Sequence, residues 1–222
     1  MTGDGVNDVL ALREADCSIA MANGSDATKN ISQLVLLNSD FASIPKIVAE
    51  GRRTINNIQR SASLFLVKTI YSMLLSLLTL ISSTEYPFIP IQLSLIGVVT
   101  IGIPSFLLAL EPNNERIHGK FLNNVIKKAL PTGILVVLFI CIWQFLSKKF
   151  VFIPEESLSS LCVLSTGFCG LGLVLSMVKK RKSEEGKLPF SVYRLVIFLS
   201  MTALFILGLT YFAPLFSISF EL

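Results

Sequence analysis

The sequence predicts a small α/β segment followed by an all-α bundle of transmembrane helices. Short apolar runs alternate with helical patterns over the first sixty residues, which also hold seven of the fifteen acidic residues, and long uncharged apolar runs follow. Hydrophobic residues make up 52% of the 222 residues and charged residues only 15%, whereas soluble domains average about 25% charged. The chain is therefore expected to be an integral, multi-pass membrane protein with a polar N-terminal segment.

The side chains suited to catalysis or metal binding are concentrated in the first eight residues. Residues 2–8, Thr-Gly-Asp-Gly-Val-Asn-Asp, place two carboxylates, a carboxamide and two glycines in one turn. Glycines let an anion approach the backbone closely, and Asp4 and Asp8 can project toward a common point if a helix begins near Val6. Such oxygen ligands suit Mg²⁺, so the loop indicates a magnesium and phosphoryl site. The alternative is that Asp4 only caps the helix and the glycines serve a tight turn.

Followed by Ala11 and Leu12, this heptapeptide resembles the hinge motif of the P-type ATPases. These cation pumps form an aspartyl-phosphate on a haloacid-dehalogenase-like phosphorylation domain. The resemblance implies a site whose residues share the binding of Mg²⁺ and of the phosphorylated group. Asp4 would ligate Mg²⁺, Asn7 and Asp8 would help to hold the phosphorylated site, and Gly3 and Gly5 would shape the loop around it.

The rest of that family's chemistry is missing from the sequence. Its Asp-Lys-Thr-Gly-Thr phosphorylation motif and its actuator Thr-Gly-Glu motif do not occur, and no residues remain for a nucleotide domain. We therefore expect the nucleophilic Asp and the ATP site to lie outside this chain, in a missing N-terminal part of the pump. The isolated chain is expected to be inactive, and Met1 falls where a pump would still be inside a strand, as in a truncated fragment or a miscalled start.

The first fifty residues have the pattern of the end of an α/β sheet. Residues 9–15 predict a helix, and residues 17–21 and 34–37 predict short buried strands. Between the strands, residues 23–26 form a turn that caps a second helix through Ser32, and helix resumes from Phe41. This alternation is typical of α/β domains. Residues 1–50 are therefore assigned to the C-terminal part of the phosphorylation domain.

Residues 51–61 connect this segment to the first apolar run. They are polar, contain no proline and continue directly into that run. The resemblance implies that they form the helical stalk of the pump's fifth membrane helix, which would carry cytosolic motion into the bilayer. A basic juxtamembrane anchor remains the alternative.

Five segments are long enough to cross about 30 Å of hydrocarbon, which assigns residues 62–222 to a membrane domain. They cover residues 62–83, 88–110, 129–146, 157–178 and 193–211. The loops at 111–128 and 179–194 are basic, whereas the loop at 84–87 has no base. The positive-inside rule therefore places residues 1–61 in the cytosol, with the cell membrane as the expected location. Because the bases lie beside apolar runs, they predict membrane orientation and no binding of nucleic acid.

The number of spans favours one branch of the family. Heavy-metal pumps carry two spans after this domain, so five spans favour the group with the calcium, sodium-potassium and proton pumps. Residues 211–215 resemble the linker before the tenth helix of calcium pumps, so the chain also appears cut at its C-terminus.

Glycine and proline within the second span, at Gly102 and Pro104, are expected to free backbone carbonyls for a transported cation. Close helix packing is the alternative explanation. Alignment of the helix registers with calcium pumps gives candidate pathway positions. They are Thr69 and Ser72 in the fifth helix and Gly97 and Thr100 in the sixth. Gly97 and Ile101 replace the Asn and Asp that are usual in the sixth helix of calcium pumps, and Gly167 occupies an eighth-helix position that can hold Glu.

These candidate positions carry no carboxylate, and no Asp or Glu lies within any of the five spans. A dehydrated divalent ion needs compensating negative charge. Calcium transport through these helices alone is therefore doubtful, and the transported cation stays open. Lys68 is the one charge well inside a span, either as an internal counter-cation or as a side chain that snorkels to the interface.

The cysteines and the histidine give little indication of a metal or catalytic site. Four cysteines show no paired spacing, and the single histidine, His118, has no second ligand nearby. Two rival functions remain for the whole chain. One is a non-catalytic membrane scaffold or remnant, and the other is a membrane-tethered phosphatase of the dehalogenase type.

Overall fold

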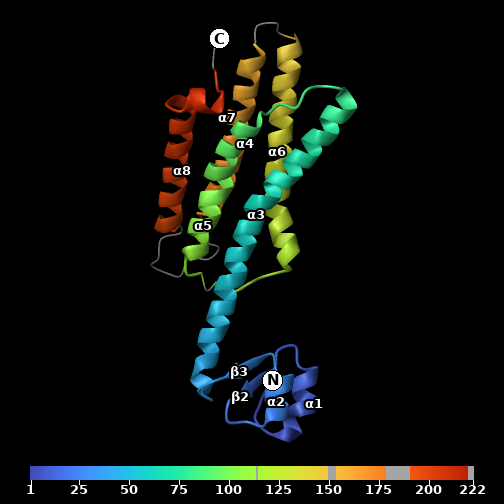
Figure 1. Cartoon of the computed structure of the whole chain (residues 1–222), viewed down its shortest axis with the longest axis vertical. Helices are drawn as coiled ribbons and strands as arrows, with labels where there is room; N and C mark the ends of the chain where they lie inside the picture. The colour runs from blue at the N-terminus through green and yellow to red at the C-terminus, as the bar shows by residue number, and fades with distance from the viewer. Residues whose placement is uncertain (114, 150–153, 179–190, 220–222) are drawn as a thin grey trace. The chain divides into compact units, whose positions relative to one another are not determined.

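The computed structural model describes residues 1–113, 115–149, 154–178 and 191–219. The chain separates into two compact units, residues 1–53 and 54–222 (Figure 1). Each unit is described by itself below.

The N-terminal unit contains a three-stranded parallel sheet. Its strands are β1 (Thr2–Gly3), β2 (Ile19–Met21) and β3 (Leu34–Leu36), in the order β1-β2-β3. The central Ala20 pairs with Gly3 on one side and Val35 on the other, and it is fully buried. The α/β class is therefore confirmed for this segment.

Short helices connect these strands. After β1, the 3₁₀ turn η1 (Val6–Asp8) leads into α1 (Val9–Glu14), and α2 (Asp26–Ile31) connects β2 to β3. The side chain of Ser25 caps α2 by accepting a hydrogen bond from the backbone amide of Thr28 at 3.2 Å. That cap is the one expected from the turn at residues 23–26.

A single long helix begins in the first unit and continues into the second. After the 3₁₀ turn η2 (Phe41–Ser43), α3 runs without interruption over 39 residues from Ile44 to Ser82. Its only proline, Pro45, lies in the first turn, where a missing N–H costs no helical hydrogen bond. Residues 51–61 are thus helical, and their role as a stalk stays a prediction.

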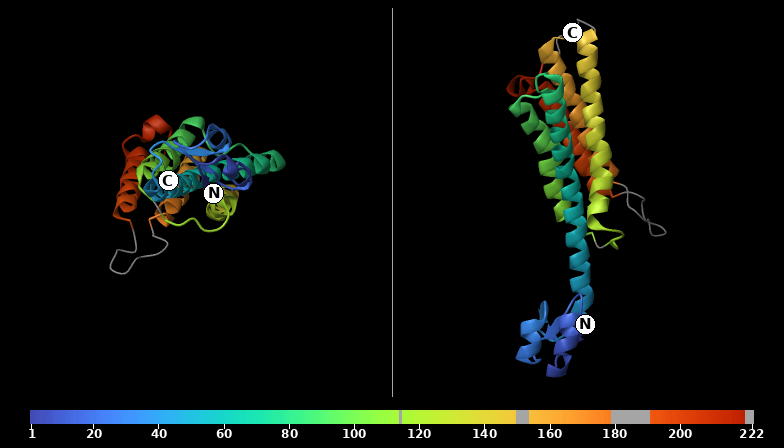
Figure 2. Two further views of the ribbon diagram at one scale, coloured as in Figure 1. Left: turned by 90° about the horizontal axis from the view of Figure 1, so that it is seen from below. Right: turned by 90° about the vertical axis from the view of Figure 1, so that its right-hand side faces the viewer.

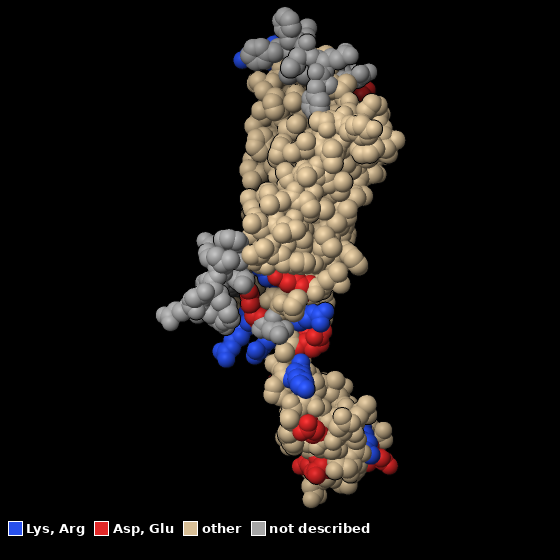
Figure 3. Space-filling model, turned by 90° about the vertical axis from the view of Figure 1, so that its left-hand side faces the viewer, with Lys and Arg blue, Asp and Glu red and all other residues tan. Residues whose placement is uncertain are grey.

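The membrane unit is built from helices that lie side by side (Figures 1 and 2). After α3 they are α4 (Pro90–Gly97), η3 (Val98–Gly102), α5 (Ile103–Leu110), α6 (Phe121–Lys149), α7 (Glu155–Ser176), α8 (Val192–Thr210) and the 3₁₀ turn η4 (Ala213–Phe216). Five helical segments among the described residues are long and apolar enough to cross a membrane. The flank of this unit carries almost no charge, and its charged residues gather at the two ends (Figure 3). The prediction of a multi-pass membrane protein is confirmed.

Two of the spans differ in detail from their predicted form. The helix of the third span begins at Phe121 rather than near residue 129, because its polar first turns contain no breaker and bury Val125. The second span is interrupted by the π-helical turn η3, where the amide of Ile103 donates to the carbonyl of Val98. Pro104 follows this turn and has no N–H to donate, which favours a widened turn.

Close packing explains Gly167, which stands at an eighth-helix position that can hold Glu in calcium pumps. A Cβ atom built on Gly167 in α7 would lie 1.9 Å from the ring of Phe205 in α8. Phe205 is fully buried. Gly167 therefore lets these two helices approach each other, as small residues commonly do in membranes.

Candidate functional site

The loop at residues 2–8 leaves the carboxyl end of β1 and closes on itself through Asp8. The Oδ2 atom of Asp8 accepts hydrogen bonds from the backbone amides of Asp4 at 3.2 Å and Gly5 at 3.1 Å. The amide of Asp8 donates to the carbonyl of Gly5 at 3.0 Å. Asp8, not Asp4, thus holds the start of the helical turn, and one of its oxygens is occupied within the loop.

The backbone of Asp4 is fixed from the neighbouring strand connection. Its carbonyl accepts a hydrogen bond from the amide of Ser25 at 2.8 Å, at the start of α2. A Cβ on Gly3 would lie 2.6 Å from the Cβ of Asp8, so only glycine fits there. The carboxylate of Asp4 is exposed at the end of this ordered backbone.

The donor set of the loop fits a hard cation such as Mg²⁺. Asp4 offers exposed carboxylate oxygens, and Asn7, also exposed, offers a carboxamide oxygen. Mg²⁺ is usually held in proteins by one or two carboxylates, with water and substrate phosphate at the other positions. No group of three or more His, Cys, Asp or Glu residues suited to a metal ion occurs in the part of the chain that the structure describes. The loop therefore supplies part of a metal site.

The apolar surface near this loop is unusually exposed. Val6 and Leu10 are 65% and 75% exposed, and Leu37, directly after β3, is 84% exposed. Large aliphatic side chains gathered on one small unit usually mark a surface that binds further protein.

Two of the pathway candidates meet in the membrane unit. The Nζ atom of Lys68 in α3 lies 3.7 Å from the position of a Cβ on Gly97, where α4 passes into η3. Thr69 is exposed, and its hydroxyl donates only to the carbonyl of Phe65 in its own helix, at 3.4 Å. Ser72 is partly buried one turn further along. The structure thus places the ammonium of Lys68 beside the point where the second span is interrupted. Thr69 takes no part in this contact.

Thr100 lies in the interior beside two buried hydroxyl groups that the sequence analysis missed. Its hydroxyl donates to the carbonyl of Ile96 at 2.7 Å, and neighbouring Ile101 is buried as well. The hydroxyls of Tyr71 and Thr166 are buried and have no hydrogen-bond partner among the described residues. With Thr100 they line a cavity of about 10 Å³, enough for one water molecule. The sequence gives one indication of this cluster. Tyr71 follows Lys68 by three residues, so both lie on the same face of a helix.

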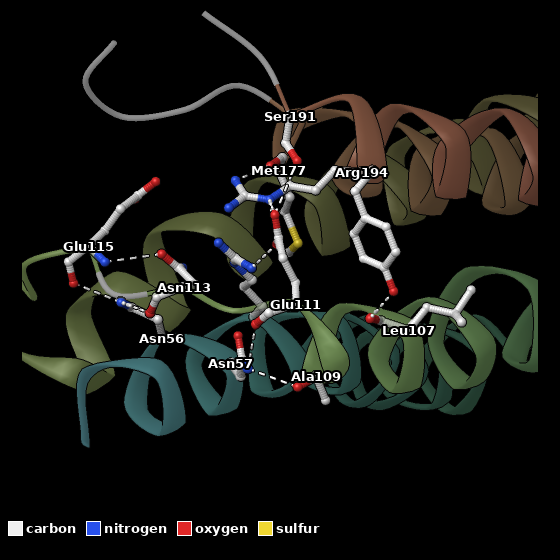
Figure 4. A network of polar contacts seen from close by, with 12 residues as sticks. Asn56, Asn57, Leu107, Ala109, Glu111, Asn113, Glu115, Met177, Ser191 and Arg194 are labelled. Atoms are coloured by element: carbon white, nitrogen blue, oxygen red, sulfur yellow. Dashed lines mark hydrogen bonds and ion pairs between the residues drawn. The ribbon is translucent and has the colours of Figure 1, made fainter. Parts of the chain in front are cut away.

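A buried ionic network lies at one end of the membrane unit (Figure 4). Glu111, directly after α5, forms ion pairs with Arg60 of α3 at 2.6 Å and with Arg194 of α8 at 2.7 Å. Ser191 donates to the same carboxylate at 3.1 Å, and Arg194 also donates to the carbonyl of Met177 at 3.0 Å. One carboxylate thus joins three spans through two guanidinium groups.

Two asparagines of α3 extend this network along the last turn of α5 and the loop that follows it. Asn57 donates to the carbonyl of Ala109 at 2.9 Å, and Asn56 donates to the carbonyl of Glu115 at 2.8 Å (Figure 4). These bonds hold the loop after α5 against α3.

The pKa of Glu111 is set by two opposing effects, burial and contact with positive charge. Burial raises the pKa of this carboxyl, but the hydrogen bonds and positive charges of Arg194 and Arg60 together leave it below the ordinary value. Glu111 is therefore ionised over the physiological range and has two cations to neutralise.

Comparison with known proteins finds similarity to a hydrolase family and to cation-transporting ATPases. A family model described as haloacid dehalogenase-like hydrolase matches residues 1–48. The chain is 50% identical over 145 residues to a probable cation-transporting ATPase of Streptococcus pneumoniae serotype 4, which covers 62% of this chain and 19% of that protein. It is 49% identical over 146 residues to the calcium-transporting ATPase CtpE of Mycobacterium bovis, covering 61% and 18%.

A more distant relative is the calcium-transporting ATPase of Bacillus subtilis. It is 35% identical over 112 residues, covering 50% of this chain and 13% of that protein. The chain thus resembles P-type cation-transporting ATPases in sequence, and it spans about a fifth of the length of the first relatives it matches.

Proposed function

From this resemblance to P-type cation-transporting ATPases, we propose that the chain is the C-terminal part of an ATP-driven cation transporter that works through an aspartyl-phosphate intermediate. The observation that carries the proposal is the loop at residues 2–8, in which a backbone held by Asp8 and Ser25 presents the exposed carboxylate of Asp4. In this proposal the nucleophilic Asp and the ATP site belong to protein outside this chain.

Each residue of the loop has a distinct task in the proposed site. Asp4 contributes oxygen ligands to Mg²⁺, which when bound would neutralise charge on the transferred phosphoryl group. Asp8 keeps the amides of Asp4 and Gly5 in place, and Asn7 offers a polar contact near the phosphorylated residue. The exposed side chains of Val6, Leu10 and Leu37 suit packing against the remainder of the phosphorylation domain.

The proposed cargo is a cation, and the relatives named calcium-transporting ATPases make calcium one candidate. The described spans offer hydroxyls, helix carbonyls and the ammonium of Lys68, and their sequences contain no Asp or Glu. Carboxylates that compensate a divalent ion would therefore come from outside these spans. Residues 1–61 would face the cytosol, as the basic loops indicate.

We expect Lys68→Met to raise the apparent affinity for the transported cation by roughly tenfold. A unit charge roughly 10 Å from a monovalent ion repels it by about 1.7 kcal/mol at an effective dielectric near 20. The measurement is ATP-driven uptake of a range of cations into vesicles that contain the protein in its full native length. Thr69→Val and Thr100→Val test the other two pathway positions in the same assay.

The matched control is Lys120→Gln, which removes an exposed base in the loop before α6. Cation affinity should be unchanged in that variant. Absence of any ATP-driven cation uptake by the unmodified protein would contradict the proposed function. Unchanged affinity and turnover in all three pathway variants would instead contradict only the placement of the pathway, and Lys68 would then be a snorkelling side chain.

A further inference from the structure

A polar cavity of about 110 Å³ lies beside the buried network of Glu111. Its walls come from α3, the loop after α5, the first turns of α6, the end of α7 and the start of α8. All of these walls belong to the membrane unit, at the end where its helices meet charged loops (Figures 3 and 4). The cavity is unrelated to the loop at residues 2–8 and to the pathway candidates.

The lining of this cavity is rich in positive charge. Its basic side chains are those of Arg60, Arg116, Lys128 and Arg194, and its one acidic side chain is that of Glu115. Glu111 does not line the cavity, but its carboxylate forms ion pairs with both Arg60 and Arg194. Among the described residues, the three arginines alone outnumber the two carboxylates, those of Glu111 and Glu115, that face or touch the cavity.

The cavity also contains a buried hydrogen-bond donor that lacks an acceptor. The Nε2 atom of Gln59 is buried and makes no hydrogen bond within the described part of the chain. The neighbouring amides are occupied, since Asn56 donates to two backbone carbonyls and Asn124 donates to the carbonyl of His118 at 2.7 Å. A buried N–H without an acceptor is unfavourable, so an acceptor in the cavity would remove this cost.

We propose that this cavity binds a phosphate-type oxyanion, supplied either by the headgroup of an anionic phospholipid or by free phosphate. A tetrahedral oxyanion carries several acceptor oxygens on a compact negative group. Arg116 is exposed at the rim and offers a planar fork of donors. Gln59 donates from the wall, and the charges of Arg60 and Arg194 attract the anion from behind the rim.

The position at the end of the spans suits either source. Headgroup phosphates lie at this level of a bilayer, and clusters of bases beside membrane helices commonly recognise them. Arg116 and His118 are also exposed, so a soluble anion has access to the same cavity.

The test uses the protein in its full native length, reconstituted into vesicles of phosphatidylcholine alone. Inorganic phosphate is titrated, and the midpoint of thermal unfolding is measured, because a ligand that binds only the folded state raises this midpoint. In parallel, the protein is placed in vesicles of phosphatidylcholine and phosphatidylglycerol in equal parts. A rise with phosphate in neutral vesicles that Arg116→Gln reduces identifies a soluble anion, and a rise with phosphatidylglycerol alone that Arg116→Gln reduces identifies the lipid headgroup.

Two variants test whether a rise in the unfolding midpoint comes from binding in the cavity. Arg116→Gln should weaken the effective ligand by about tenfold, because it removes one charge-assisted contact. Gln59→Met should abolish most of the rise while leaving the ligand-free protein as stable as before or more so, because it removes the unpaired donor. Circular dichroism establishes that both variants retain their helical content.

Lys127→Gln is the matched control, since Lys127 is an exposed base in α6 that does not line the cavity. It should leave the rise unchanged. The proposal is overturned if neither phosphate nor phosphatidylglycerol raises the midpoint, or if Lys127→Gln reduces the rise as much as Arg116→Gln does.

Discussion

Replacing Asp4 with Ala should reduce Mg²⁺-dependent ATP hydrolysis by the protein in its full native length by about a thousandfold. In the proposed site this carboxylate holds the ion that neutralises charge on the transferred phosphoryl group. The side chain is exposed, and its backbone, not its carboxylate, makes the contact with Ser25. The loss should therefore appear in turnover while the fold is retained. The measurement is phosphate release as a function of Mg²⁺ concentration.

Asp26→Ala is the matched control for this loss. Asp26 is an exposed carboxylate in the same unit, where it pairs with Lys29 at 3.2 Å within α2. Such exposed pairs contribute about 0 to 1 kcal/mol, so activity and stability should change little. Equal activity of the Asp4 and Asp26 variants would contradict the assignment of Asp4.

Replacing Glu111 with Ala should lower the free energy of unfolding of the membrane unit by about 3 to 5 kcal/mol. Arg60 and Arg194 have side chains only 8% and 6% exposed, and the substitution leaves two buried cations without the carboxylate that neutralises them. Denaturant titration in detergent, followed by loss of helical signal, measures the change. Glu50→Gln, which breaks an exposed pair with Arg53, should change the same quantity by at most about 1 kcal/mol.

The lowered pKa of Glu111 predicts how the free energy of unfolding depends on pH. Because the pKa of Glu111 is lowered in the folded protein, its contribution is fully present above the ordinary carboxyl pKa of about 4.3. The contribution is lost as the pH falls through the lowered folded pKa. Glu111→Gln should therefore reduce the acid sensitivity of unfolding. An unchanged pH profile in that variant would contradict the role assigned to this network.

The sequence predicts local features of this protein well. The turn at residues 2–8 and the cap at Ser25 follow from glycines and short polar side chains whose partners lie within a few residues. The five spans follow from the length and composition of apolar runs. Gly102 and Pro104, singled out in the second span for freed backbone carbonyls, lie at the end of the π-helical turn of residues 98–102 and just after it.

Features that depend on distant residues were not predictable in the same way. Glu111 meets Arg60 and Arg194 across sequence separations of 51 and 83 residues, and no local pattern specifies which base a carboxylate will meet. Helix register alone matched Gly167 to a position that can hold Glu in calcium pumps, whereas its contact with Phe205 depends on the packing of α7 against α8. The same limit applies to the cavity beside Gln59, which needs five separate segments to form.

The location of the phosphorylated residue tests the account most directly. The protein in its full native length is incubated briefly with γ-³²P-labelled ATP and Mg²⁺, quenched in acid and digested, and the labelled peptide is identified. We expect an acid-stable, hydroxylamine-sensitive label on an Asp outside residues 1–222, with no labelling of this chain when it is purified alone. A label on Asp4, Asp8 or any other residue of this chain would contradict the account.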